Sequence, residues 1–170
     1  GPGATNLVNG VANALLERAP LLVISAQVAT SMAAVLPHQR VDLEGLFRPI
    51  TKWSQTLTGT DTAATVQRAL DLTVEGRPGP VYLALPVDVA RMEEPAAAYR
   101  SEPYQTLPTI APTSAEIDRA ARMIAEARTP LAVVGIGLDP IASRPELLRW
   151  LDAAQIPVVV PPKAKGLVPE

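Results

Sequence analysis

Helical apolar periodicity alternates with short, continuous apolar runs along the first 90 residues. The first repeat predicts a helix over residues 6–17, which Thr5 or Asn6 would cap. The run LLVIS that follows, residues 21–25, is typical of a strand buried on both faces of a parallel sheet. The same alternation predicts helices near 41–46 and over 61–75, and strands around 50–55 and 81–85. This order indicates an α/β fold.

A second α/β segment begins at Thr113. Thr113 and Glu116 have the spacing of a capping box, which predicts a helix start, and the strand LAVVG follows at 131–135. Ser143 and Glu146 have the same spacing, with Pro145 in the first turn of a further helix. The run VVV at 158–160 predicts a last strand. The second segment therefore holds two strands.

Residues 91–112 interrupt the pattern with four prolines and no sustained apolar period, which predicts a semi-extended linker. We therefore expect a domain at 1–90, a linker at 91–112 and a second domain at 113–170. Three strands and two strands are few for a sheet. Each piece is thus predicted to be part of a larger three-layer, parallel-sheet domain of Rossmann-like architecture.

Composition excludes several classes of function. A net charge of −2, from 15 basic and 17 acidic residues, gives no electrostatic footprint for nucleic acid or anionic lipid. The absence of cysteine excludes disulfides and thiolate metal sites, and it fits a reducing cytosol. The apolar runs are too short to span a bilayer, and no leader is recognised. We expect a cytoplasmic protein that binds neither membranes nor nucleic acid.

The opening hexapeptide GPGATN carries candidate binding chemistry. Gly1 and Gly3 would permit positive φ and close backbone approach, while Pro2 would give a rigid apolar surface. Asn6 offers a donor and an acceptor at a helix start. Such a turn can lie against a flat heterocycle, although an ordinary strand-to-helix loop has the same composition.

Six ordered motifs together resemble one enzyme family. They are GPGATN, the helix and strand that follow it, HQRVDLEGLFRPITKW, RPGPVYLALPVDV, ARTPLAVVGIGL and PVVVPPKAKG. This order is similar to thiamine-diphosphate-dependent enzymes of the acetolactate synthase and benzoylformate decarboxylase type. The resemblance covers essentially the whole chain, from the pyrimidine-binding domain into the start of the central domain. We therefore expect a fragment of such an enzyme.

The resemblance implies site residues. Pro2 and Asn6, within the turn that includes Gly1 and Gly3, would lie against the aminopyrimidine ring of the cofactor. Gln39, with His38 beside it, would line the active site near the thiazolium and the substrate. His38 is the only histidine of the chain, and a solvated or capping role is the alternative.

Four positions depart from the acetolactate synthase pattern. His38 stands where a bulky aromatic is common and Arg40 where an acidic residue is frequent. Val87 takes the place of a lysine, and Ala29 that of a proline. These departures favour a related 2-oxo acid decarboxylase, lyase or carboligase over acetolactate synthesis.

The resemblance also implies thiamine diphosphate and Mg²⁺ as cofactors of the intact enzyme. In the family, a glutamate upstream of GPG and a downstream GDG motif serve the cofactor and the metal. Neither lies in these 170 residues, so we expect no metal site here and no activity of the chain alone. FAD is an open alternative without further support, because Gly135 and Gly137 are followed by Pro140 rather than by a third glycine.

The implied partners are a small 2-oxo acid or related carbonyl and further copies of the enzyme, as a homodimer or homotetramer. Lys163 and Lys165 could attract phosphate or could be ordinary solvated surface. A hypothesis of another class remains open. The chain would then be a non-catalytic binding or dimerisation module that keeps the family architecture.

Overall fold

The computed structural model describes residues 1–32, 34–35, 38–93, 111–138 and 141–169. The chain divides into two compact units, unit 1 at 1–107 and unit 2 at 108–170. Most of the predicted linker, residues 94–110, lies outside the described residues. At its start Arg91 still belongs to the 3-10 helix η3 (Val89–Arg91).

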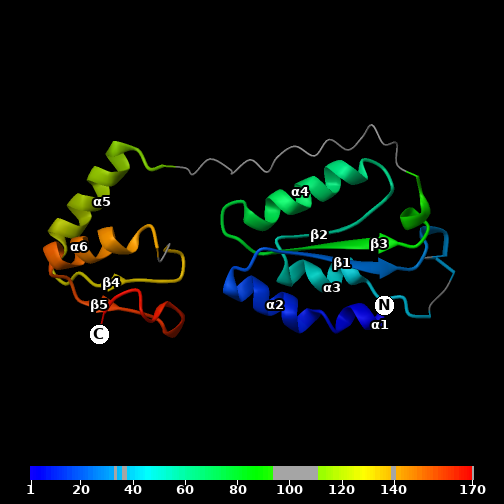
Figure 1. The fold of residues 1–170 in the computed structure, drawn as a ribbon, viewed down its shortest axis with the longest axis horizontal. Coiled ribbons are helices and arrows are strands. Elements are labelled where there is room, and N and C mark those ends of the chain that lie inside the picture. Colours follow the sequence, from blue (N-terminus) through cyan, green and yellow to red (C-terminus); the bar gives the residue numbers. More distant parts are fainter. Residues whose placement is uncertain (33, 36–37, 94–110, 139–140, 170) are drawn as a thin grey trace. The chain divides into compact units, whose positions relative to one another are not determined.

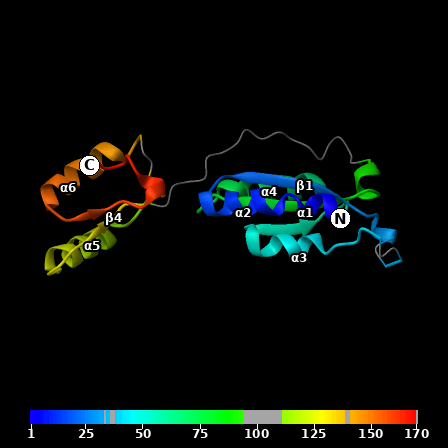
Figure 2. The same cartoon turned by 90° about the horizontal axis from the view of Figure 1, so that it is seen from below.

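Unit 1 is a three-layer α/β/α arrangement around a parallel sheet, as predicted. The strands β1 (Leu21–Gln27), β2 (Trp53–Thr56) and β3 (Pro80–Pro86) have the order β1-β3-β2. One face of the sheet carries α4 (Thr62–Val74), and the other carries α2 (Val8–Glu17) and α3 (Leu43–Phe47) (Figure 1). Figure 2 shows α2 and α3 next to each other on that face. The short elements are α1 (Pro2–Thr5), η1 (Thr30–Met32) and η2 (Arg48–Ile50).

The two faces of the sheet bury separate cores. Beneath α2 and α3, the core residues are Ala4, Val11, Val23, Leu43, Phe47, Tyr82 and Ala84. Beneath α4 they are Leu57, Ala69, Val81, Leu83 and Val89. β3 contributes to both because it is the central strand, and four of its consecutive residues are fully buried, Val81 to Ala84.

The prediction that the run 21–25 is buried on both faces is wrong, because this run forms β1, which is only partly buried. β1 pairs only with β3 among the described residues, so it is an edge strand. Ile24 is 48% exposed, whereas Val23 on the opposite face is buried. A continuous apolar run predicts the strand and leaves its place in the sheet undetermined.

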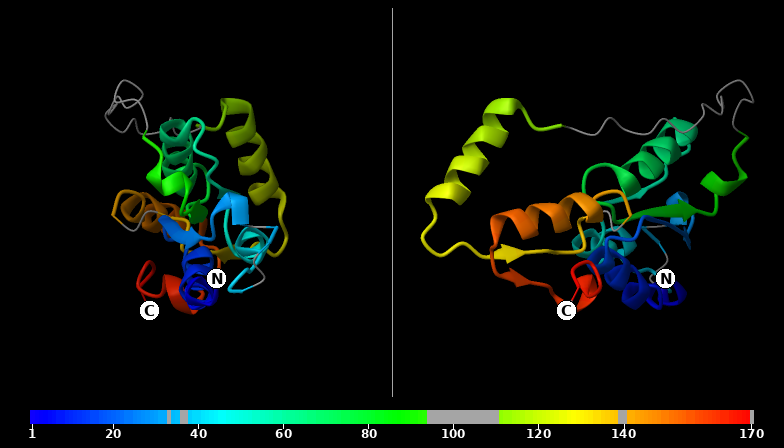
Figure 3. Two further views of the ribbon diagram at one scale, coloured as in Figure 1. Left: turned by 90° about the vertical axis from the view of Figure 1, so that its right-hand side faces the viewer. Right: turned by 60° about the vertical axis from the view of Figure 1, so that its left-hand side comes forward.

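Unit 2 contains a two-stranded parallel sheet, as predicted. β4 (Ala132–Val133) pairs with β5 (Val158–Val159), and α6 (Arg144–Ala154) packs on the pair through Leu147. The helix α5 (Ser114–Glu126) has no buried residue, and Figure 3 shows it to one side of the β4–α6 segment. The 3-10 helix η5 (Pro162–Ala164) follows β5.

Of the two predicted capping boxes, one is confirmed. The Thr113 side chain accepts from the Glu116 amide, and the Glu116 carboxylate accepts from the Thr113 amide at 2.8 Å. These hydrogen bonds hold the pKa of Glu116 below its ordinary value. The box at Ser143 is wrong, because Ser143 is the N-cap of α6 but its side chain makes no capping hydrogen bond.

The core beneath α3 contains one polar pair. The Tyr82 hydroxyl lies 2.7 Å from Ser25 Oγ, and the Tyr82 ring stacks on Phe47 with ring centroids 4.0 Å apart. Burial raises the pKa of Tyr82. The pair links β1 to β3 through side chains as well as through the backbone ladder.

We predict that Tyr82→Phe lowers the free energy of unfolding by about 1 kcal/mol, because the Ser25 hydroxyl loses its partner. Ser25→Ala combined with Tyr82→Phe should lose less than the sum of the two single changes. Urea unfolding of all four proteins measures this coupling. Strict additivity would show that the 2.7 Å contact contributes nothing to stability.

Candidate active site

The opening hexapeptide is helical rather than a loop. Pro2 occupies the first helical position of α1, where its fixed φ suits the helix. The Ala4 amide donates to the Gly1 carbonyl at 2.9 Å. Gly3 does not have the positive φ that we expected. Asn6 is the C-cap of α1 and keeps right-handed helical angles. The prediction that Thr5 or Asn6 caps the following helix is also wrong, because Leu7 is the N-cap of α2.

This helix places three of the predicted cofactor residues on one surface. Pro2 and Asn6 are four residues apart and Gly3 and Asn6 three apart, so they share a helix face, which we call the α1 face. All three are exposed, while Ala4 points into the core. A Cβ built on Gly3 would meet no atom within 4 Å. The surface at Gly3 is therefore open, with no other part of the described chain packed on it.

Gly1 is in direct contact with Gln39, so a predicted cofactor-binding residue and a predicted catalytic residue lie together. A Cβ on Gly1 would fall 1.9 Å from the Gln39 carbonyl oxygen, so only glycine fits. Gln39 itself has a φ of 56°, in the left-handed region that non-glycine residues seldom adopt. Both Gln39 and His38 are exposed. Close backbone approach, one of the two roles expected of the glycines, is thus found at Gly1.

A cavity of about 450 Å³ lies at the carboxyl ends of all three strands of unit 1. The last residues of β1, β2 and β3, which are Gln27, Thr56 and Pro86, all line it. Ligands of open α/β sheets bind at this edge. We call it the strand-end cavity, and its other lining residues are Val28, Thr30, Arg40, Val41 and Asp42.

Gln27 joins this cavity to the segment that carries Gln39. Its Nε2 donates to the Val41 carbonyl at 3.2 Å, and its Oε1 accepts from the Val28 amide at 3.0 Å. The segment 39–41 is therefore held at Gln39 by the fit against Gly1 and at Val41 by Gln27. Sequence reasoning missed Gln27, Thr30 and Thr56. Their positions at or just after strand ends were the available signal.

Asp88 ties together the loops that follow β1 and β3. The Thr30 amide donates to both carboxylate oxygens at 3.0 Å, and the Thr30 hydroxyl donates to Oδ2. The bonds from Thr30 hold the pKa of Asp88 below its ordinary value of 3.8. Asp88 also accepts from the Val89 amide as the N-cap of η3. These hydrogen bonds give Asp88 a structural role, since they fix two loops and cap η3.

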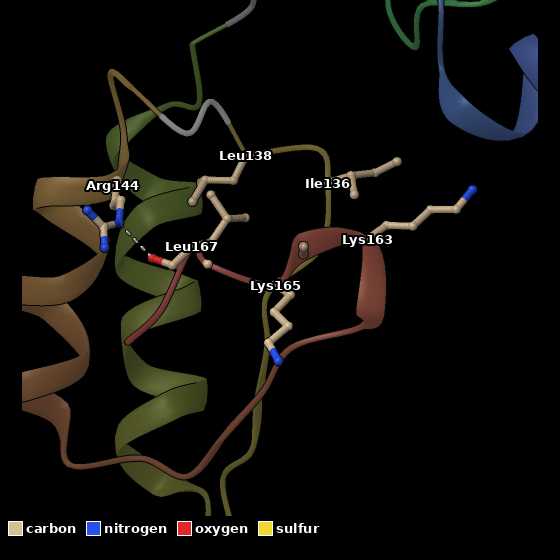
Figure 4. Close-up of a pocket in the computed structure, with 8 residues that line it drawn as sticks. Ile136, Leu138, Arg144, Lys163, Lys165 and Leu167 are labelled. Atoms are coloured by element: carbon tan, nitrogen blue, oxygen red, sulfur yellow. Dashed lines mark hydrogen bonds between the residues drawn. The ribbon is translucent and has the colours of Figure 1, made fainter. Parts of the chain in front are cut away.

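Unit 2 has its own cavity, of about 490 Å³, at the carboxyl ends of β4 and β5 (Figure 4). Arg144 lines it, but Arg144 Nε donates to the Leu167 carbonyl at 3.1 Å. Figure 4 shows the ammonium groups of Lys163 and Lys165 pointing in different directions. The remaining lining residues are Ile136, Leu138, Ala164, Gly166 and Leu167. This is a mixed surface rather than a focused cationic one.

Comparison with known proteins adds the family. The model described as "Thiamine pyrophosphate enzyme, N-terminal TPP binding domain" matches residues 1–48, which include the α1 face and Gln39. The model described as "Thiamine pyrophosphate enzyme, central domain" matches residues 117–170. The chain belongs to the thiamine pyrophosphate enzyme family. The first match lies within unit 1 and the second within unit 2.

Relatives of this thiamine pyrophosphate enzyme chain include acetolactate synthases. It is 35% identical to the probable acetolactate synthase large subunit of Methanocaldococcus jannaschii, covering 100% of the chain and 30% of that protein. It is 34% identical to the acetolactate synthase large subunit of Corynebacterium glutamicum, covering 100% of the chain and 28% of that protein. It is 32% identical to the acetolactate synthase isozyme 3 large subunit of Escherichia coli, covering 99% of the chain and 30% of that protein. The chain thus spans about 30% of the length of these relatives.

Two further findings concern metals and membranes. Among the described residues, no group of three or more His, Cys, Asp or Glu side chains is placed to hold a metal ion. No helix in the described part of the chain has the length and apolar character needed to cross a membrane.

We predict that Gly1→Ala displaces the backbone at Gln39, because the added methyl group would overlap the Gln39 carbonyl. Gly3→Ala is the matched control. It adds the same methyl group in open space, and it should raise helix stability by about 0.5–1 kcal/mol. Amide NMR shifts of residues 38–41 measure the displacement. Equal shifts in the two variants would contradict the Gly1–Gln39 contact.

A second prediction concerns acid stability. Because the folded pKa of Asp88 lies below 3.8, its carboxylate stabilises the fold fully above that pH. This contribution is lost as the pH falls further, through the lowered pKa. Asp88→Asn should therefore be less stable than the wild type at neutral pH, with a difference that shrinks in acid.

Urea unfolding of both proteins across this range tests the prediction. Asp61→Asn is the control, because the Asp61 side chain makes no capping hydrogen bond. A wild-type advantage over Asp88→Asn that stays constant down to the lowest pH would contradict the account.

Proposed function

We propose that this chain forms part of the active site of a thiamine-diphosphate-dependent enzyme acting on a 2-oxo acid or related carbonyl compound. The contact of Gly1 with Gln39 carries the proposal, because it sets the α1 face beside the residue expected to meet substrate. Pro2 and Asn6 would hold the pyrimidine ring, and the exposed, open surface at Gly3 supports this placement. The cofactor, when bound, supplies the carbon–carbon bond chemistry, while the protein positions it.

In this proposal the residues of unit 1 bind the cofactor and the substrate and orient them. Asn6 offers an amide donor and acceptor to ring nitrogens, and Pro2 offers an apolar surface. Gln39 presents its side chain from a backbone fixed by Gly1 and, through Val41, by Gln27. His38 is exposed beside Gln39, and in this proposal it would face the substrate as well. We propose that Mg²⁺ is bound by residues outside this chain and that the chain alone is inactive.

We further propose that the reaction is a decarboxylation, lyase or carboligation reaction other than acetolactate synthesis. The relatives named above are acetolactate synthases, so the proposal depends on Ala29, His38, Arg40 and Val87. Arg40 lines the strand-end cavity, and Val87, exposed just after β3, puts an apolar group where the resemblance implies a lysine. Both changes alter charge close to the proposed site.

Cofactor and assembly complete the proposal. An additional nucleotide cofactor such as FAD stays an open alternative for the unit 2 cavity, whose lining includes Arg144. We expect a cytoplasmic homodimer or homotetramer. The alternative, a non-catalytic binding or dimerisation module, shares the same fold and differs in having no ligand at the α1 face.

A segment exchange tests the proposal. Residues 1–170 replace the aligned segment of the Corynebacterium glutamicum relative, and a second exchange replaces only the part aligned with residues 1–48. With thiamine diphosphate, Mg²⁺ and pyruvate, we expect CO₂ release from the exchanged proteins and none from the isolated chain. Flavin absorbance of the purified proteins reports on the unit 2 cavity.

Asn6→Ala in the exchanged protein should raise the thiamine diphosphate concentration needed for half-maximal activity by about tenfold, since a hydrogen bond to the ring is lost. Acetolactate as the main product would overturn the proposed reaction class. Well-folded exchanged proteins without cofactor binding would favour the binding-module alternative.

A further inference from the structure

Most polar side chains of the strand-end cavity are hydrogen-bonded to other groups of the protein. The Thr56 amide and hydroxyl donate to Glu44 Oε2, at 3.1 and 3.2 Å. The Thr30 backbone amide and hydroxyl donate to Asp88. The side-chain amide of Gln27 donates to the Val41 carbonyl and accepts from the Val28 backbone amide. These polar side chains thus have their main hydrogen-bonding groups engaged by protein partners.

The carboxylates at the cavity are engaged in the same way. Asp42 Oδ1 accepts from the Gly45 amide at 2.8 Å as the N-cap of α3. Glu44, beneath Thr56, also accepts from Arg48. Asp42 and Glu44 thus each accept hydrogen bonds that hold α3 and the strand ends, and Asp42 is the one carboxylate among the residues that line the cavity.

Arg40 is the exception. Among the described residues, no hydrogen bond or ion pair holds its guanidinium, although this group carries five N–H donors. Arg40 directly follows Gln39, whose left-handed backbone sets the direction of the chain at this point. A planar guanidinium with free N–H donors, next to side chains that are already hydrogen-bonded, is suited to bind a carboxylate through two parallel hydrogen bonds.

We propose that Arg40 binds the carboxylate of a small ligand in the strand-end cavity. The cavity volume of about 450 Å³ leaves room for a small organic acid beside the side chain. Identifying the ligand as a 2-oxo acid rests on the proposed function. The anion site itself does not, because it needs only the residues of unit 1 described here.

The test is titration of the isotope-labelled chain with pyruvate, followed by amide NMR at residues 27–30, 40–42 and 56–57. Methyl pyruvate, which has the same skeleton without the negative charge, is the ligand control. We expect saturable shifts with pyruvate in the millimolar range, typical of one charge-assisted contact, and none with methyl pyruvate.

Two variants and a matched control locate the binding group. Arg40→Gln should weaken pyruvate binding about tenfold or more, and Arg40→Lys should weaken it less because the charge remains. Arg77→Gln makes the same change in net charge at an exposed arginine before β3, at the amino end of the sheet. It should bind like the wild type.

Several outcomes would overturn the proposal: no saturable shift at these amides, equal binding of methyl pyruvate, or an equal effect of Arg77→Gln. Sedimentation of the wild type and Arg40→Gln adds a further arm. If Arg40→Gln dissociates an oligomer and pyruvate has no effect, the carboxylate belongs to a second copy and the proposal fails. Because no thiamine diphosphate is present, failure here leaves the segment exchange unaffected, and an inactive exchanged protein leaves this binding unaffected.

Discussion

The parallel register of three strands around β3 places the residues of the strand-end cavity. Gln27 at the end of β1 pairs with Pro86, and Thr56 at the end of β2 pairs with Ala84 of the same strand. Two hydrogen bonds continue the ladder past the strand ends, from the Val87 amide to Gln27 and from the Leu57 amide to Ala84. Because all three strands run the same way, segments far apart in sequence deliver polar side chains to one edge.

The core beneath α3 keeps that edge in place. Phe47 and Tyr82 are fully buried and stacked, so α3 is fixed on β3, and the N-cap of α3 is Asp42. Residues 39–42 therefore end at a firmly packed helix and begin at the close contact with Gly1. A strained backbone at Gln39 persists only where its surroundings determine it. Here the backbone at Gln39 is determined by the contact with Gly1, by the hydrogen bond from Gln27 to Val41 and by the N-cap at Asp42.

Local sequence signals predicted the elements that depend on local physics. The Thr113 capping box forms because its two partners are three residues apart, and no distant contact is needed. α4 follows the 61–75 prediction closely, with Asp61 as N-cap and Gly76 at a φ of 61° after its end. The buried run 80–86 became the central strand because apolar residues were available for both faces.

Tertiary context decided the rest. LLVIS and VYLAL have the same apolar pattern, and only pairing makes one an edge strand and the other central. GPGATN contains two glycines and a proline, which favour a turn. Burial of Ala4 in the core that also contains Val11 and Phe47 instead favours a helical conformation, which these residues can also adopt. The contact of Gly1 with Gln39 spans 38 positions, beyond the reach of any periodicity argument.

The helices of the two units differ in how much apolar surface they bury. In unit 1 every sheet face has a helix with buried apolar residues, and the strand ends are held by side-chain hydrogen bonds. In unit 2, α5 is well capped but wholly exposed, with Ile117 at 55% and Met123 at 62%. A cap selects where a helix starts, whereas packing of an apolar face supplies most of a helix's stability. The precise geometry that a binding site needs is therefore present around Gln39 and Arg40, where local caps and tertiary packing act on the same segment.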